Sequence, residues 1–142
     1  MSNADIFDTI LGDIQTKRTA PGGKYRALVH DVKEANNPKN GNRGRELHFR
    51  LLDAMNGQDL TDVSLEDEQV RDTIWVTPKS LPIARETIQR MAPDTPSTLG
   101  IREAFENLRG REVIIHTELM TMGRDGKPLR FPRLQVTGYE AA

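Results

Sequence analysis

Apolar and polar residues alternate with a period of two in several short stretches, which is the pattern of strands with one buried face. Residues 24–32 and 46–52 have this pattern, and residues 73–77 are β-branched or aromatic, as strands commonly are. Residues 36–44, between the first two stretches, are mostly turn formers and include no large apolar side chain. They predict an exposed loop that joins these two strands into a hairpin.

The pattern changes to a helical period after the third predicted strand. Apolar residues at helical spacing predict two helices, one over residues 81–91 and a shorter one over 101–108. Their apolar faces carry Leu81, Ala84, Ile88 and Met91 in the first helix, and Ile101, Ala104, Phe105 and Leu108 in the second. Ser97 or Thr98 is the expected cap of the second helix.

A period of two returns in residues 111–122 and 131–139, and the Asp125-Gly126 turn between them predicts a second hairpin. Five strands with helices between the third and the fourth match a small Greek-key barrel of the oligonucleotide-binding (OB) type. The predicted fold is therefore mainly β: a five-stranded OB-fold barrel with a helical connector between strands 3 and 4 and a short N-terminal helix.

The N-terminal part differs from the rest in its pattern. Apolar side chains at helical spacing predict a short amphipathic helix formed around Ile6, Phe7, Ile10, Leu11 and Ile14. Pro21-Gly22-Gly23 then interrupts the chain, and the strand pattern begins directly afterwards. We therefore divide the chain into an N-terminal helix and linker (1–20) and one OB-fold domain (21–142), with an acidic insertion at about 56–70.

Charge is distributed unevenly along a chain that is nearly neutral as a whole. The 142 residues include 20 Lys and Arg and 21 Asp and Glu, for a formal net charge of −1. The segment from 17 to 50 is nevertheless strongly basic, and the segment from 51 to 72 is strongly acidic. Because a hairpin brings the residues of both strands onto one surface, the basic segment favours an anionic ligand.

The sequence contains little that points to catalysis or to a cofactor. It has no cysteine, which excludes thiolate nucleophiles and Cys-ligated metal sites. Its three histidines, His30, His48 and His116, lie in predicted strands without the spacing of a metal site, and the acidic residues of 58–69 lack the pattern of a calcium loop. We expect a binding protein that is not an enzyme, with no catalytic residues, no metal and no cofactor.

Basic side chains on the two predicted hairpins are the candidates for contacts with phosphate groups. On the first hairpin and its loop they are Lys24, Arg26, Lys33, Lys39, Arg43, Arg45 and Arg50. On the second hairpin they are Arg124, Lys127, Arg130 and Arg133. Two basic hairpins that flank a barrel groove would follow the sugar-phosphate backbone of a nucleic acid strand.

Few aromatic side chains are left for stacking on nucleic acid bases. Of the seven present, Phe7, Phe49 and Phe105 are in phase with apolar neighbours and are expected in the core. The candidates for base stacking are Trp75, Tyr25, Tyr139 and Phe131. Trp75 is the foremost, because its two neighbours take the other face of its strand. The alternative is a tryptophan that seals the barrel end against a helix.

Four segments, in their order and spacing, resemble phage-encoded single-stranded-DNA-binding proteins with an OB fold. They are residues 21–27 (PGGKYRA), 41–52 (GNRGRELHFRLL), 108–113 (LRGREV) and 133–139 (RLQVTGY). The resemblance spans most of the chain. The sequence departs from the family in the acidic residues 58–69, which form a longer segment than is expected for that loop.

The resemblance implies a protein that binds single-stranded DNA with little sequence preference in phage DNA replication, recombination or repair. Its implied partners are single-stranded DNA and phage replication or recombination proteins, and its implied location is the host cytoplasm, away from membranes. The alternative is an OB module for protein interactions, which self-associates or recruits replication proteins through its acidic and basic segments. A nuclease, which needs acidic side chains around a divalent metal, is a third interpretation.

Overall fold

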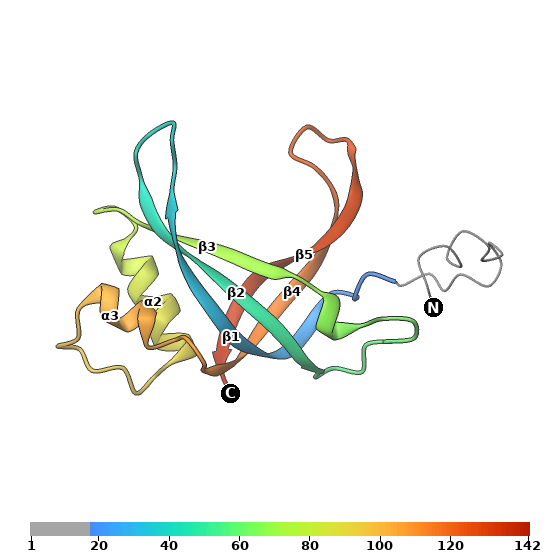
Figure 1. Ribbon diagram of the computed structural model, residues 1–142, viewed down its shortest axis with the longest axis horizontal. Coiled ribbons are helices and arrows are strands. Elements are labelled where there is room, and N and C mark those ends of the chain that lie inside the picture. The colour runs from blue at the N-terminus through green and yellow to red at the C-terminus, as the bar shows by residue number, and fades with distance from the viewer. Residues whose placement is uncertain (1–17) are drawn as a thin grey trace, which may run out of the picture.

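The computed structural model describes residues 18–142 (Figure 1). The predicted N-terminal helix, including Phe7, falls outside the described residues. The elements in chain order are β1 (Gly23–Asn36), β2 (Arg43–Ala54), the 3-10 turn η2 (Leu65–Asp67), β3 (Val70–Val76), α2 (Leu81–Met91), α3 (Ile101–Glu106), β4 (Glu112–Met122) and β5 (Pro128–Ala141). The order of five strands with helices between the third and the fourth agrees with the prediction.

The strands form one antiparallel sheet in the order β3-β2-β1-β4-β5. The long strand β1 lies at its centre: residues 25–36 pair with β2, and residues 23–28 also pair with β4. Register shifts in β1, after Arg26 and after Val29, mark irregularities that allow a strand to bend. The fold is therefore mainly β, with a five-stranded open sheet that is compatible with a barrel-like arrangement.

Side chains, not a backbone ladder, connect the two edge strands. The Tyr139 hydroxyl of β5 donates a hydrogen bond to the Asp72 carboxylate of β3. The Tyr139 ring also packs near Phe49 of β2, with 5.9 Å between the ring centroids. The sheet must therefore be curved enough to bring its first and last strands together.

The core lies on the inner face of this curved sheet and extends to the helices. Phe49 and Phe105 are almost completely buried, which confirms the prediction that both belong to the core. Ala84, Ile88 and Met91 of α2 join the same cluster, but Leu81, predicted on the same helix face, is 43% exposed. Leu81 is the first residue of α2, and it lies at the end of the apolar helix face, outside the core cluster.

One detail of the helical connector differs from expectation. Helix α3 is preceded by Gly100 at the N-cap position, and not by the predicted Ser97 or Thr98. After α3, Gly110 adopts a left-handed conformation with φ 83°, which glycine tolerates without strain. Its N–H donates to the Val29 carbonyl at 2.7 Å, and this bond ties the end of the helical connector to β1.

Most of the acidic insertion at about 56–70 is irregular, as predicted. Its only described regular element is the single turn η2, which packs beside β2, and a short bridge pairs Arg18 with Val63. Within residues 18–142, no helix combines the length and the apolar composition that a membrane crossing requires.

Candidate nucleic-acid interface

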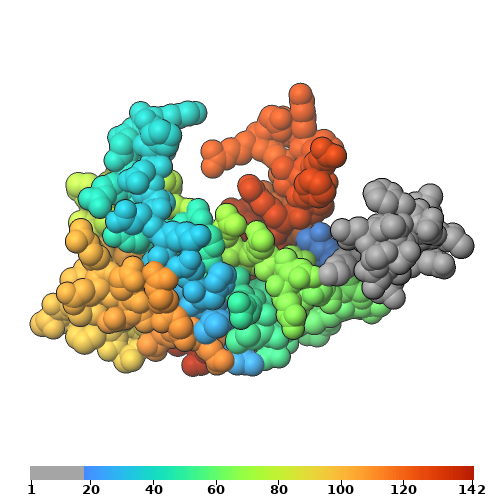
Figure 2. Space-filling model, viewed as in Figure 1, coloured from blue at the N-terminus to red at the C-terminus, as the bar shows by residue number. Residues whose placement is uncertain are grey.

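Two hairpins project from the same side of the molecule and leave a hollow between them (Figures 1 and 2). The β1–β2 arm is defined here as residues 33–46, with its tip at 37–42, and the β4–β5 arm as residues 119–134, with its tip at 123–127. Atoms of the β3 region lie at the floor of the hollow in the space-filling view. The prediction of two hairpins that flank a groove therefore agrees with the shape of the molecule.

The sheet presents an outer face, which consists of the side chains of β1, β2 and β3 that point away from the core. On β2, Glu46, His48 and Arg50 alternate with the buried Leu47, Phe49 and Leu51. On β3, the outward positions are Arg71, Thr73 and Trp75, which lie opposite His48, Glu46 and Gly44 respectively. The outer face therefore combines one aromatic ring with several charged groups.

Trp75 lies at the base of the β1–β2 arm, where it pairs with Gly44 of β2. A Cβ atom on Gly44 would lie 3.0 Å from Cε3 of the indole and 2.5 Å from the carbonyl oxygen of Ile74. The indole therefore packs closely on the glycine backbone. Trp75 is 37% exposed and is not part of the core cluster.

The other predicted stacking residues differ widely in exposure. Phe131 on the β4–β5 arm is 75% exposed, and the Arg130 guanidinium lies 5.5 Å from its ring centroid. The prediction for Tyr25 is wrong, because its ring is fully buried and its hydroxyl donates to the Pro21 carbonyl at 2.5 Å. Tyr25 is in phase with the buried Ala27 and Val29, so its ring points into the core.

Tyr139 is also unsuited to base stacking. Its ring packs near Phe49, and its hydroxyl is engaged by Asp72. Burial raises the pKa of Tyr139, and the nearby Asp72 carboxylate raises it further. The prediction that this ring contacts bases is therefore wrong, since it serves to connect β5 with β3.

Ion pairs divide the predicted phosphate-binding residues into two groups. Lys24 lies 3.0 Å from Glu140, and Arg26 is bracketed by Asp53 and Glu112. Both cations lie in the N-terminal half of β1, at the opposite end of the strand from the arm tip. Lys24 and the tip are separated by about 40 Å along an extended strand. The structure does not bring these two cations together with the others.

The cations nearer the arms are mostly without partners. Lys33 lies 3.8 Å from Asp31, and Arg45, whose side chain is only 11% exposed, lies 4.0 Å from Glu34. No ion pair to another described residue is found for the remaining predicted cations, which are Lys39, Arg43, Arg50, Arg124, Lys127, Arg130 and Arg133. Four of the seven lie on the β4–β5 arm, and two lie on the β1–β2 arm.

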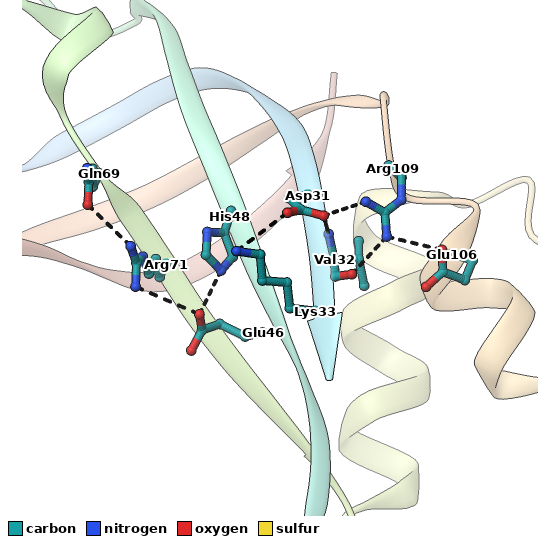
Figure 3. Close-up of polar contacts among 9 residues, drawn as sticks. All are labelled: Asp31, Val32, Lys33, Glu46, His48, Gln69, Arg71, Glu106 and Arg109. Atoms are coloured by element: carbon teal, nitrogen blue, oxygen red, sulfur yellow. Dashed lines mark hydrogen bonds and ion pairs between the residues drawn. The ribbon is translucent and has the colours of Figure 1, made fainter. Parts of the chain in front are cut away.

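A network of ion pairs on the outer face was not anticipated from the sequence (Figure 3). The Glu46 carboxylate lies 2.6 Å from Nε2 of His48 and 4.0 Å from Nη1 of Arg71. Arg71 also donates to the side-chain oxygen of Gln69 at 3.3 Å. The negative charge of Glu46, in the middle of the outer face, is therefore stabilised by His48 and Arg71.

The same view shows a second cluster at the β1 side of the face. Arg109, from the turn after α3, donates to the Asp31 carboxylate and to the Val32 carbonyl, the latter at 2.8 Å. The guanidinium lowers the pKa of Asp31 below its usual range. Asp31 and Arg109 are 78 residues apart in the chain, so the sequence alone carried no signal of their contact.

No family model matches the chain, and no curated protein matches it. The chemistry of the site therefore rests on its geometry. Among the residues that the structure describes, no group of three or more His, Asp or Glu side chains is placed to hold a metal ion. The arrangement offers exposed cations on two arms and an indole at the base of one of them, which are groups suited to contact phosphates and bases.

Proposed function

We propose that this protein binds single-stranded DNA without catalysing a reaction, and that the strand lies in the hollow between the two arms. The observation that carries the proposal is the position of Trp75, which lies against Gly44 at the base of one basic arm and faces outward. The cations of both arms that have no ion pair with another described residue would contact phosphates, and Trp75 and Phe131 would stack on bases.

The topology supports a finer assignment of the fold, an OB-fold barrel. In this fold, a five-stranded sheet is nearly closed, and oligonucleotides bind across its outer face between two hairpin loops. Strand β1 pairs with both β2 and β4, and the contact between Tyr139 and Asp72 connects β5 with β3. The two arms occupy the positions of those hairpin loops.

The distribution of groups favours binding with little sequence preference. Contacts to phosphates carry no direct information on base identity, and stacking tolerates every base. Only two exposed aromatic rings remain among the predicted four, so phosphate contacts would supply most of the affinity. Such a protein fits a role in phage DNA replication, recombination or repair, as the sequence resemblance suggests.

Titration of fluorescently labelled oligothymidylate at several salt concentrations tests the proposal. We expect the logarithm of the binding constant to fall linearly with the logarithm of the salt concentration, with a slope of about −0.7 for each phosphate contacted. Absence of binding, or affinity that does not change with salt, would contradict the proposal. Self-association without affinity for DNA would favour the protein-interaction module instead.

A further inference from the structure

A small pocket lies on the outer face beyond the Glu46 network, between β2, β3 and the acidic segment. It has a volume of about 260 Å³, below the range of about 300–1,000 Å³ that is typical of sites for drug-sized ligands. Its walls include His30, His48, Arg50, Glu66, Gln69 and Arg71. His48 is four residues along β2 from Gly44, the partner of Trp75, so the pocket and the indole are separated by about 13 Å.

His48 presents its second ring nitrogen, Nδ1, to this pocket. Its side chain is only 9% exposed, and its Nε2 atom lies 2.6 Å from the Glu46 carboxylate. A neutral ring that donates through Nε2 leaves Nδ1 as an acceptor. No partner of Nδ1 is found among the described residues, in which every fully buried side-chain polar atom has one, so Nδ1 is open to the solvent side.

Arg50 and Glu66 line the pocket from opposite elements, β2 and η2. Neither side chain has an ion pair or a hydrogen bond with another described residue. In contrast, Glu68 accepts a hydrogen bond from the Ala20 amide at 2.8 Å, and Arg71 is engaged by Gln69 and Glu46. Among residues 18–142, the pocket therefore holds a guanidinium, a carboxylate and an imidazole nitrogen that have no partner.

These groups suit a nucleobase better than a phosphate. A phosphate would be repelled by the Glu66 and Glu68 carboxylates, whereas a base is neutral and carries donors as well as acceptors. The neighbouring His30 ring, 5.9 Å from that of His48 between centroids, offers a flat surface for stacking. Desolvation and the nearby Arg50 lower the pKa of His30.

We propose that this pocket receives one base of the bound strand and that it prefers guanine. Guanine has two acceptors side by side, O6 and N7, which match the fork of an arginine such as Arg50. It also carries N1–H and N2–H₂ donors side by side on another edge, which match the two oxygens of the Glu66 carboxylate. The inference rests on the proposed binding of single-stranded DNA, to which it adds a local preference for one base.

The test compares oligothymidylate with the same oligonucleotide that carries a single central guanine, adenine or cytosine. We expect the guanine oligonucleotide to bind at least about fivefold more tightly, since a good bidentate contact discriminates by about that factor or more. Glu66→Gln should remove the preference because it removes the carboxylate. Arg50→Lys should also remove it, because lysine keeps the charge but loses the planar fork.

Asp62→Asn is the matched control for the loss of one negative charge. Asp62 lies in the same acidic segment but does not line the pocket, and its backbone φ of 61° is one that asparagine tolerates. This variant should keep the preference for guanine.

If oligothymidylate binds but all four oligonucleotides have equal affinity, or if another base is preferred, the guanine preference is wrong. The proposed binding of single-stranded DNA would then still stand. A guanine preference that survives both Glu66→Gln and Arg50→Lys would also overturn the inference. Absence of binding to every oligonucleotide would instead overturn the proposed function, and this inference with it.

Discussion

The indole of Trp75 on β3 packs against the backbone of Gly44 on β2, where a Cβ atom would lie 3.0 Å from the ring and only 2.5 Å from the Ile74 carbonyl oxygen. Gly44→Ala should therefore displace either the ring or the strand. We expect a loss of about 1–3 kcal/mol in the free energy of unfolding, as is usual for overpacking, measured by urea denaturation. Affinity for oligothymidylate should fall as well. Gly100→Ala, where a Cβ meets nothing within 4 Å and φ is −67°, is the control without a clash.

Removal of the Trp75 ring should weaken binding without unfolding the protein. The ring is partly exposed and lies outside the core cluster, so its contribution to stability should be small compared with its contribution to stacking. Trp75→Ala should reduce the affinity for single-stranded DNA about 5- to 150-fold, which corresponds to about 1–3 kcal/mol for one stacked base. Trp75→Phe should retain much of the affinity. Unchanged affinity in the alanine variant, measured by fluorescence anisotropy, would place the strand elsewhere.

The tip of the β4–β5 arm should contribute to the salt dependence of binding. Arg124 and Lys127 are exposed and have no ion pair with another described residue, so they are free to contact phosphates. Their combined replacement by glutamine should make the salt slope shallower by about 1.4, or about 0.7 for each lost contact with a single strand. The matched control is Lys24→Gln combined with Arg26→Gln, since both cations are already paired with carboxylates. Equal effects of the two double variants would refute the division of the cations into two groups.

The buried carboxyl of Asp72 should make stability depend on pH. Burial raises the pKa of Asp72, although the hydrogen bond from Tyr139 opposes this shift. Because the pKa is higher in the folded than in the unfolded state, stability should fall as pH rises from about 4 through the raised folded pKa, and should then level off. Asp72→Asn should lack this component. Urea denaturation of the wild-type protein and of Asp72→Asn across the pH range measures this component. A difference in the free energy of unfolding between the two proteins that is constant with pH would contradict the prediction.

The sequence predicted the parts of the fold that depend on local patterns. Alternation identified the strands that contain Leu47 and Phe49, and helical spacing identified the face of α2 that buries Ile88. The strand ends were less accurate, because β1 extends to Asn36, well beyond the last readable alternation. In such an arm the backbone ladder persists after both faces have become polar.

The candidate site was predictable in its loops and less so in its side chains. Both basic hairpin tips and the outward position of Trp75 followed from composition and phase. Tyr25 is in phase with Ala27, and this pattern indicates a buried ring, which does not suit base stacking. The ion pairs of Lys24 with Glu140 and of Arg26 with Glu112 join residues far apart in the chain, and only the folded sheet reveals them.

The seam between β3 and β5 has a consequence for the behaviour of the protein at high concentration. An edge strand with free N–H and C=O groups can pair with the edge of another molecule and so begin aggregation. Here each edge lies beside the other, and the contact of Tyr139 with Asp72 keeps them together without a backbone ladder. Loosening this contact would expose two unpaired strand edges at once, so the seam protects the protein against aggregation as well as holding its shape.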